Sequence, residues 1–340
     1  MSDEAVASQL EALGFWVGSP ALVAASIVAF QRCASLVVDG IAGPITLEAL
    51  ERTSRQELAV GRIPSAELLV GDRPFVAWFE GVRKARPNLF PYPLSADGFT
   101  RVSAHLSVLG MGVGLSAAEL FAMFSIVYNE TGGTFGSRAE LGGPGYCFGT
   151  NGGKKSSYNL AVNGNRLAGD QLAARGLLRT PLEIRRWNTT SWPNPPQGSD
   201  LYQAALECDF YKYRGHALCQ ITWRNAHIAY ADPAIALVSD RTSEQMTTEE
   251  LDAVLSDDPT VYCLATALFF HDPNWAGPAL SKVNQGDFET LGRRVSGSTS
   301  YATLCATRCK ALLEEAQDGL GIAEPSGSFL PPQVCKGRAS

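Results

Sequence analysis

One acidic residue of this sequence stands where general-acid chemistry can be expected. Glu130 closes an otherwise apolar stretch with helical periodicity and is followed closely by Gly132 and Gly133. Apolar surroundings and the partial negative charge at a helix C-terminus both disfavour an ionised carboxylate, so the sequence predicts a raised pKa for Glu130. A carboxyl group that stays protonated near neutral pH can protonate a glycosidic oxygen as its bond breaks. A surface glutamate at a fraying helix end is the alternative.

The residues around Glu130 resemble a known signature. Residues 129–133 read Asn-Glu-Thr-Gly-Gly, which is similar to the His-Glu-Thr-Gly-Gly motif of family 19 glycoside hydrolases. That family contains plant-type chitinases and phage or bacterial endolysins. The resemblance implies that Glu130 is the general acid, while Asn129 replaces the histidine of the motif.

A second stretch, residues 213–222, resembles the Tyr-Arg-Gly-Arg-Gly-Leu-Ile-Gln-Leu-Thr segment of the same family. The resemblance implies that Gln220 and Thr222 line the sugar cleft, where an amide and a hydroxyl suit neutral sugars. Asn225 is a candidate for an amide that the family has nearby. A buried strand with satisfied polar groups, over 217–222, is the alternative. In and just after this stretch, the chain departs from the family pattern at four positions: His216, Ala217, Ala226 and His227.

The general base is less directly marked. An inverting glycosidase needs a second carboxyl about 6.5–9.5 Å from the acid. In the plant-type pattern the base follows a Gly-Tyr-Cys-Phe element by three residues; that element is present at 145–148, but Asn151 holds the base position. Glu140 falls roughly on a Glu-Asn-Leu element of endolysin relatives and is therefore the base that we expect, with a solvated loop carboxylate as the alternative. Asn151 or Thr150 holding the water is a further alternative, and Tyr146 and Asn151 are candidate substrate contacts.

A third stretch completes the resemblance. Residues 286–298 resemble a family segment that ends in Ile-Asn-Gly-Gly, with Ser296 where asparagine is usual. The three stretches occur in the order of the family, within residues 116–310.

The N-terminal residues 1–55 read as a compact helical unit similar to the three-helix peptidoglycan-binding domain of many wall hydrolases. The residues that carry this resemblance are Leu10, Leu13, Gly14, Phe30, Gln31, Val38, Asp39, Gly40, Gly43, Pro44, Thr46, Ala49 and Leu50. Gln31, Asp39 and Gly40 are the wall-binding candidates. A generic helical bundle with a tight turn is the alternative.

The elements that must position these residues are predicted to be mainly α-helical. Expected helices cover 8–13, 21–33, a segment capped by Thr46 and ending at Leu50, 75–83, the run after the Ser116–Glu119 capping box, 261–270 and 303–317. Residues 142–200 read as long irregular loops. The expected domains are 1–65 (wall binding and linker), 66–325 (a lysozyme-like catalytic domain of the family 19 type) and 326–340 (a tail).

Composition limits the remaining classes of function. The formal net charge of −6 argues against nucleic-acid binding. No apolar stretch reaches the ~20 residues that span a membrane, and residues 1–4 do not begin a secretory signal. The four histidines show no metal spacing, and no cofactor is expected. The tryptophans are core residues by default, with Trp192 the best candidate for stacking on a sugar. The eight cysteines suit either disulfides or buried thiols.

The sequence therefore predicts a glycoside hydrolase that lyses bacterial walls as an inverting N-acetylmuramidase and takes peptidoglycan glycan strands as its partner. Catalysis would use Glu130 and Glu140. A chitinase and a non-catalytic wall-binding protein remain the alternatives. A phage lysis system or a secretion system would deliver the protein to the cell wall, and a cognate inhibitor is a compatible further partner.

Overall fold

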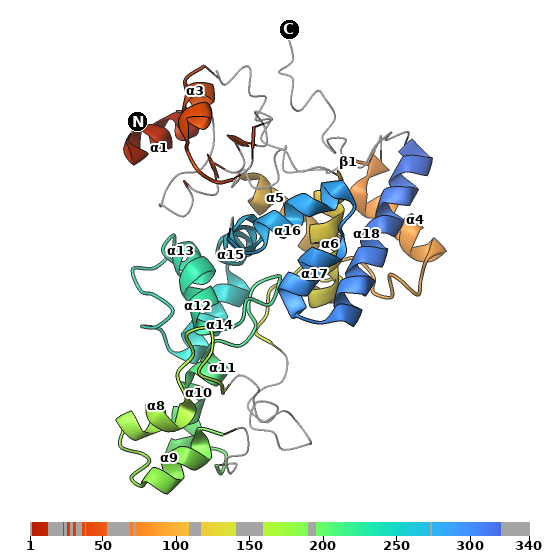
Figure 1. Cartoon of the computed structure of the whole chain (residues 1–340). Coiled ribbons are helices and arrows are strands. Elements are labelled where there is room, and N and C mark those ends of the chain that lie inside the picture. The colour runs from red at the N-terminus through yellow and green to blue at the C-terminus, as the bar shows by residue number, and fades with distance from the viewer. Residues whose placement is uncertain are drawn as a thin grey trace. The chain divides into compact units, whose positions relative to one another are not determined.

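The structure is a computed structural model in which the chain is mainly α-helical (Figure 1). It describes residues 2–12, 23, 26–27, 30–31, 36–37, 39–52, 69–70, 73–108, 117–140, 159–189, 195–272 and 274–320. The chain divides into two compact units, the first made of Met1–Gly136 and Thr266–Ser340 and the second of Ser137–Ala265. The boundary predicted near residue 65 and the predicted tail lie outside the described residues. Within the described residues, no helix is long and apolar enough to cross a membrane.

The first unit is built around helix α6. Its elements are α1 (Asp3–Ala12), α3 (Pro44–Arg52), β1 (Leu69–Val70), β2 (Arg73–Pro74), α4 (Phe75–Ala85), α5 (Ala96–Val108), α6 (Ala117–Thr131), α16 (Gly277–Lys282), the 3-10 turn η2 (Val283–Gln285), α17 (Glu289–Ser296) and α18 (Thr299–Leu320). Helix α15 (Pro259–His271) crosses the division between the units. Helices α16 and α18 contact α6, and α17 packs against α18. The two short strands pair antiparallel, with Leu69 opposite Pro74.

Aromatic side chains fix α6 in this unit. Phe124 of α6 lies 4.9 Å from Phe75 and 5.0 Å from Phe79, measured between ring centroids, and both partners come from α4. Phe99 of α5 stacks on Phe75 at 4.8 Å. A helix that is apolar on almost every side must be enclosed by other elements. Each aromatic ring left in water would lose about 2–3 kcal/mol of the free energy gained by burial. The packing therefore leaves little freedom to the C-terminal end of α6, where Glu130 lies.

The N-terminal part of the first unit has a small core of its own, made by Val6, Leu10, Ile27, Phe30 and Leu50. The described residues of the helix predicted over 21–33 are helical. Thr46 does not cap the last helix: α3 begins at Pro44, and Thr46 is buried inside it, where its hydroxyl accepts a hydrogen bond from Gln31. The first helix begins at Asp3, five positions before the predicted start.

The second unit consists of short helices. These are α8 (Ala168–Ala174), α9 (Pro181–Trp187), α10 (Asp200–Leu206), α11 (Asp209–Lys212), α12 (Arg224–Ala226), the π-helical turn η1 (His227–Ala231), α13 (Asp232–Ile235) and α14 (Thr248–Asp257). The prediction of irregular loops over 142–200 is wrong for 168–174 and 181–187, where α8 and α9 form and share a buried core with Phe210. Helix α9 begins with Pro181 after a full capping box, in which Thr180 and Glu183 bind each other's backbone N–H groups.

Three of the remaining predicted helices are confirmed, and two other predicted elements differ from the structure. Helices α4, α6 and α15 confirm the predictions over 75–83, after residue 116 and over 261–270. The last helix, α18, extends beyond the predicted 303–317 at both ends. The strand predicted over 217–222 is a tight turn instead. Trp275 is not a core residue: it is 44% exposed, and the guanidinium of Arg294 lies over its ring at 4.8 Å.

Candidate functional site

Glu130 lies half-buried in the last turn of α6. The helix ends as predicted, because Gly132 and Gly133 adopt φ values of 58° and 78°. The N–H of Gly133 donates to the carbonyl of Tyr128 at 3.0 Å, and the carbonyl of Gly133 accepts from the N–H of Ser95 at 2.9 Å. These bonds satisfy backbone groups that a helix end otherwise leaves open. The backbone next to the candidate acid is therefore fixed from both sides.

Tyr301 of α18 is a titratable neighbour of Glu130. Its hydroxyl is buried and forms no hydrogen bond of regular geometry with the described residues, but it interacts with the Glu130 carboxyl. Burial, followed by the nearby Glu130 charge, raises the pKa of Tyr301 far above its ordinary value. The phenol therefore stays protonated and can only donate to the carboxylate. The raised pKa expected for Glu130 itself stays a prediction.

Asn129, which replaces the histidine of the family motif, has a defined structural role. Its side-chain oxygen accepts a hydrogen bond of 2.7 Å from Nη1 of Arg308 in α18. The same guanidinium donates through Nε to the carbonyl of Leu89 at 2.6 Å and lies over the Tyr128 ring at 5.2 Å. Arg308 thus ties the residue before Glu130 to α18. A charge-assisted bond of this kind is stronger than one between neutral groups.

The helix end also gives a prediction about stability. A Cβ at Gly133 would lie 2.4 Å from the backbone oxygen of Pro93, which cannot move freely, and φ there is positive. Gly132 also has a positive φ, but a Cβ would meet nothing within 4 Å. We expect Gly133→Ala to lower the free energy of unfolding by about 3 kcal/mol and Gly132→Ala by only about 1 kcal/mol, the strain of a left-handed residue.

Urea unfolding of the two variants measures this difference. Both carry the same added methyl group and the same backbone strain, so Gly132→Ala is the matched control. Equal losses of stability would show that the backbone around Pro93 does not enclose Gly133.

In the second unit, the structure joins Glu140 to the stretch that was predicted to contact sugar. The backbone N–H of Glu140 donates to the carbonyl of Gly215 at 2.7 Å, and the N–H of Gly215 donates to Oε2 of Glu140 at 3.3 Å. These two residues are 75 positions apart in the sequence. The reciprocal bonds fix both the backbone and the carboxylate of Glu140, so the alternative of a freely solvated loop carboxylate does not describe this side chain.

Gln220 lies beside that junction. A Cβ at Gly215 would be 2.2 Å from Oε1 of Gln220, so only glycine leaves room for the amide in this position. The Gln220 side chain is partly exposed and makes no hydrogen bond to the described residues. The Thr222 hydroxyl instead donates to the backbone carbonyl of Gln220 at 2.8 Å. Gln220 is therefore a candidate for contacting a ligand, and Thr222 supports the turn that presents it.

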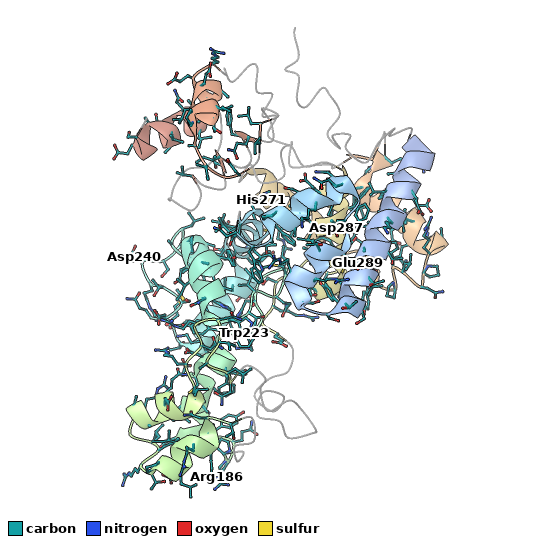
Figure 2. The ribbon with its side chains drawn as sticks, in the orientation of Figure 1. Arg186, Trp223, Asp240, His271, Asp287 and Glu289 are labelled. Atoms are coloured by element: carbon teal, nitrogen blue, oxygen red, sulfur yellow. The ribbon has the colours of Figure 1, made fainter. Side chains whose placement is uncertain are left out.

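The backbone of this turn is strained. Ala217, Gln220 and Trp223 all have positive φ values, of 59°, 55° and 81°, although none is glycine. Such residues cost of order 1–3 kcal/mol each and cluster at functional sites. His216 and Ile221 close the turn with two backbone hydrogen bonds of 3.0 and 2.7 Å. The side chain of Trp223, labelled in Figure 2, follows at the end of the turn.

Asn225 lies just beyond the turn but is used elsewhere. Its backbone N–H donates to the carbonyl of Asn163 at 3.0 Å, and its side-chain oxygen lies 1.9 Å from where a Cβ of Gly164 would stand. Because the amide packs on the 163–164 turn, the contacts of Asn225 do not group it with Glu140 and Gln220. Tyr146, Asn151 and Trp192 lie outside the described residues.

Two of the four departures from the family motif prove to be partners. Nδ1 of His216 lies 2.9 Å from Nε2 of His227, and Nε2 of His216 lies 2.8 Å from Oδ1 of Asp252 in α14. Both imidazoles are completely buried. The sequence did not predict the contacts among His216, His227 and Asp252, because Asp252 is remote in the chain. The only signal was that two histidines, eleven positions apart, stand where the family has other residues. Arg214 also pairs with Asp252.

The wall-binding candidates of the N-terminal core are hydrogen-bonded to one another. Nε2 of Gln31 donates to Oδ1 of Asp39 at 2.7 Å, while Oε1 of Gln31 accepts from the N–H groups of Asp39 and Gly40 at 3.1 and 2.9 Å. Gln31 is 1% exposed, so its amide serves the loop rather than a ligand. The bonds from Ile41 and Gln31 lower the pKa of Asp39 and keep it ionised.

The candidate residues are thus distributed over both units: Glu130 belongs to the first, and Glu140, Gln220 and Thr222 belong to the second. Within the described residues, no group of three or more His, Cys, Asp or Glu side chains is arranged to hold a metal ion. The chain matches no protein-family model and no curated protein, so a function must be argued from its own residues.

Proposed function

We propose that this chain is a peptidoglycan hydrolase that cleaves the β-1,4 glycosidic bonds of the glycan strand, as an N-acetylmuramidase acting with inversion. In this proposal Glu130 protonates the leaving oxygen, Glu140 deprotonates the attacking water, and Gln220 binds the sugars. A catalytic part of the lysozyme-like, family 19 type, preceded by a three-helix wall-binding module, belongs to the same proposal. No cofactor takes part.

The junction of Glu140, Gly215 and Gln220 carries the proposal. The sequence pointed to Glu140 and to the 213–222 stretch on separate grounds, and their reciprocal hydrogen bonds now make them neighbours. A fixed carboxylate can accept a proton from water, and an adjacent, partly exposed amide can donate to and accept from sugar hydroxyl and acetamido groups. Such a pair of polar groups suits a site for neutral N-acetylhexosamines.

The surroundings of Glu130 support the role of acid. Its helix is enclosed by aromatic side chains, and its C-terminus is fixed through Gly133 and Arg308. A rigid, half-buried carboxyl at the C-terminal end of a helix meets one condition for a general acid, a defined position, and the helix end is expected to disfavour its charge. The N-terminal core, with its resemblance to wall-binding modules, favours peptidoglycan over chitin as substrate. Release or secretion machinery and a cognate inhibitor are the further partners that we propose.

Mass spectrometry of digested peptidoglycan tests the reaction and its site. We expect the full-length protein to release soluble fragments with N-acetylmuramic acid at the new reducing end, because a muramidase cuts on that side of the sugar. Glucosamine at this end would instead identify a glucosaminidase. Turnover of colloidal chitin with intact walls would identify a chitinase, and retention on walls without any release would identify a binding protein.

A further inference from the structure

Two buried histidines, the half-buried Asp252 and the backbone of Trp223 form one continuous series of polar contacts at the turn that presents Gln220. It runs from Asp252 Oδ1 to His216 Nε2 at 2.8 Å, from His216 Nδ1 to His227 Nε2 at 2.9 Å, and from His227 Nδ1 to the carbonyl of Trp223 at 2.9 Å. All three separations are those of hydrogen bonds. The proposed mechanism does not use any of these side chains, so their arrangement needs another reason.

The number of hydrogens on the two imidazole rings decides whether all three contacts can be hydrogen bonds. The Trp223 carbonyl can only accept, so Nδ1 of His227 must carry a hydrogen. The Asp252 carboxylate can only accept, so Nε2 of His216 must carry one as well. The contact between the two rings then needs a third ring hydrogen, but two neutral imidazoles carry only two. Without an added proton, two lone pairs face each other across 2.9 Å in a buried place.

This series of polar contacts is connected directly to the candidate sugar site. His216 closes the turn that presents Gln220 and follows Gly215, which binds Glu140. Trp223 ends the same turn and accepts from the ring of His227. We propose that Asp252, His216 and His227 form a proton-dependent clamp. When these side chains share one added proton, the clamp holds the turn in its binding geometry. When that proton leaves, the turn loosens.

The charges around the clamp set its working range. Burial lowers the pKa of His216, and Asp252 opposes that effect. Burial, then His216, lowers the pKa of His227 well below its ordinary value, and Arg214 and Lys212 act in the same direction. The shared proton is therefore bound only below the ordinary pKa of histidine, and the turn loosens as the pH rises towards neutrality. Asp252 and His227 act here as positioning residues for Gln220 and Glu140.

Replacing Asp252 by asparagine tests the clamp in a specific way. The asparagine amide can donate to Nε2 of His216, so the ring can donate from Nδ1 to His227 and every contact is satisfied without an added proton. We expect the affinity of full-length Glu130→Gln protein for tetra-N-acetylchitotetraose to fall about tenfold from pH 5 to pH 8. With Asp252→Asn added, the affinity should stay at its acidic level across this range. Asp257→Asn, an exposed change on the same helix, should keep the pH dependence.

Nitrogen NMR of the histidine rings gives a readout that does not depend on sugar binding. In the parent protein, His216 and His227 should together gain a third N–H as the pH falls, with the amide signals of the turn moving at the same midpoint; in Asp252→Asn they should not. This sugar-binding role rests on the proposed function, so a protein that binds no sugar would refute that function while the ring titration still decides the clamp. The inference would be overturned if the two rings never shared a third proton. It would also be overturned if the Asp252→Asn variant kept the pH dependence of the parent protein or bound the sugar weakly at every pH.

Discussion

Replacing Glu130 by glutamine is expected to reduce the release of soluble fragments from peptidoglycan by a factor of about 10²–10⁴, the usual contribution of a general acid. The amide has nearly the shape of the carboxyl group, so the aromatic packing of α6 and the bond between Asn129 and Arg308 should persist. The rate of fragment release and the temperature of unfolding, measured on the same preparation, separate a chemical effect from a structural one.

A matched control is available in the same unit. Glu289, labelled in Figure 2, forms an exposed ion pair with Arg293 on α17. Exposed pairs of this kind contribute about 0.3–0.5 kcal/mol, so Glu289→Gln should leave both stability and lysis nearly unchanged. If Glu130→Gln lysed walls as fast as the parent protein, Glu130 could not be the acid.

Gly215→Ala is expected to weaken binding of tetra-N-acetylchitotetraose by about 10–100-fold, because the methyl group takes the place of the Gln220 amide and its hydrogen bonds to the sugar. The Cβ would lie 2.2 Å from Oε1 and 3.1 Å from Cβ of Gln220. The first contact is relieved if the side chain turns away, and the second requires a small shift of the turn. We therefore expect a loss of stability of only about 1–2 kcal/mol.

Calorimetric titration with the sugar, together with urea unfolding, measures both quantities. Gly81→Ala is the control, since a Cβ on this exposed residue of α4 meets nothing within 4 Å. It should stabilise the helix by about 0.5–1 kcal/mol and leave sugar binding as it is. Unchanged affinity in Gly215→Ala would mean that the Gln220 amide does not contact the sugar.

Local sequence signals predicted the helix that carries Glu130 well. The apolar periodicity before Glu130 and the two glycines after it required a long enclosed helix with an abrupt end, and α6 ends there. These signals suffice because helix periodicity and positive φ at glycine are properties of neighbouring residues. The helices of the 142–200 region escaped prediction for the opposite reason. They are only seven residues long, too short for periodicity to show, although the capping box at Thr180 was visible in the sequence.

The turn that presents Gln220 could not be predicted in this way. Its β-branched and apolar residues favoured a strand, but Ala217 and Gln220 adopt positive φ values that these residue types rarely choose on their own. Tertiary contacts impose this backbone: Glu140 holds Gly215 from one side, and Asp252 and His227 hold His216 from another. Such contacts join residues far apart in the chain, so no window of sequence contains them.

The buried sulfurs of both units share a further property. Five cysteines are buried thiols, which confirms the thiol alternative for Cys208, Cys219, Cys263, Cys305 and Cys309. Burial raises the pKa of Cys208 to about 12 and of Cys305 to about 11, and the thiolate is the form that alkylating agents and oxidants attack. Each unit therefore shields its own sulfurs for as long as it stays closed. For these five described cysteines, we therefore expect the rate of oxidation to depend on how often the surrounding structure opens.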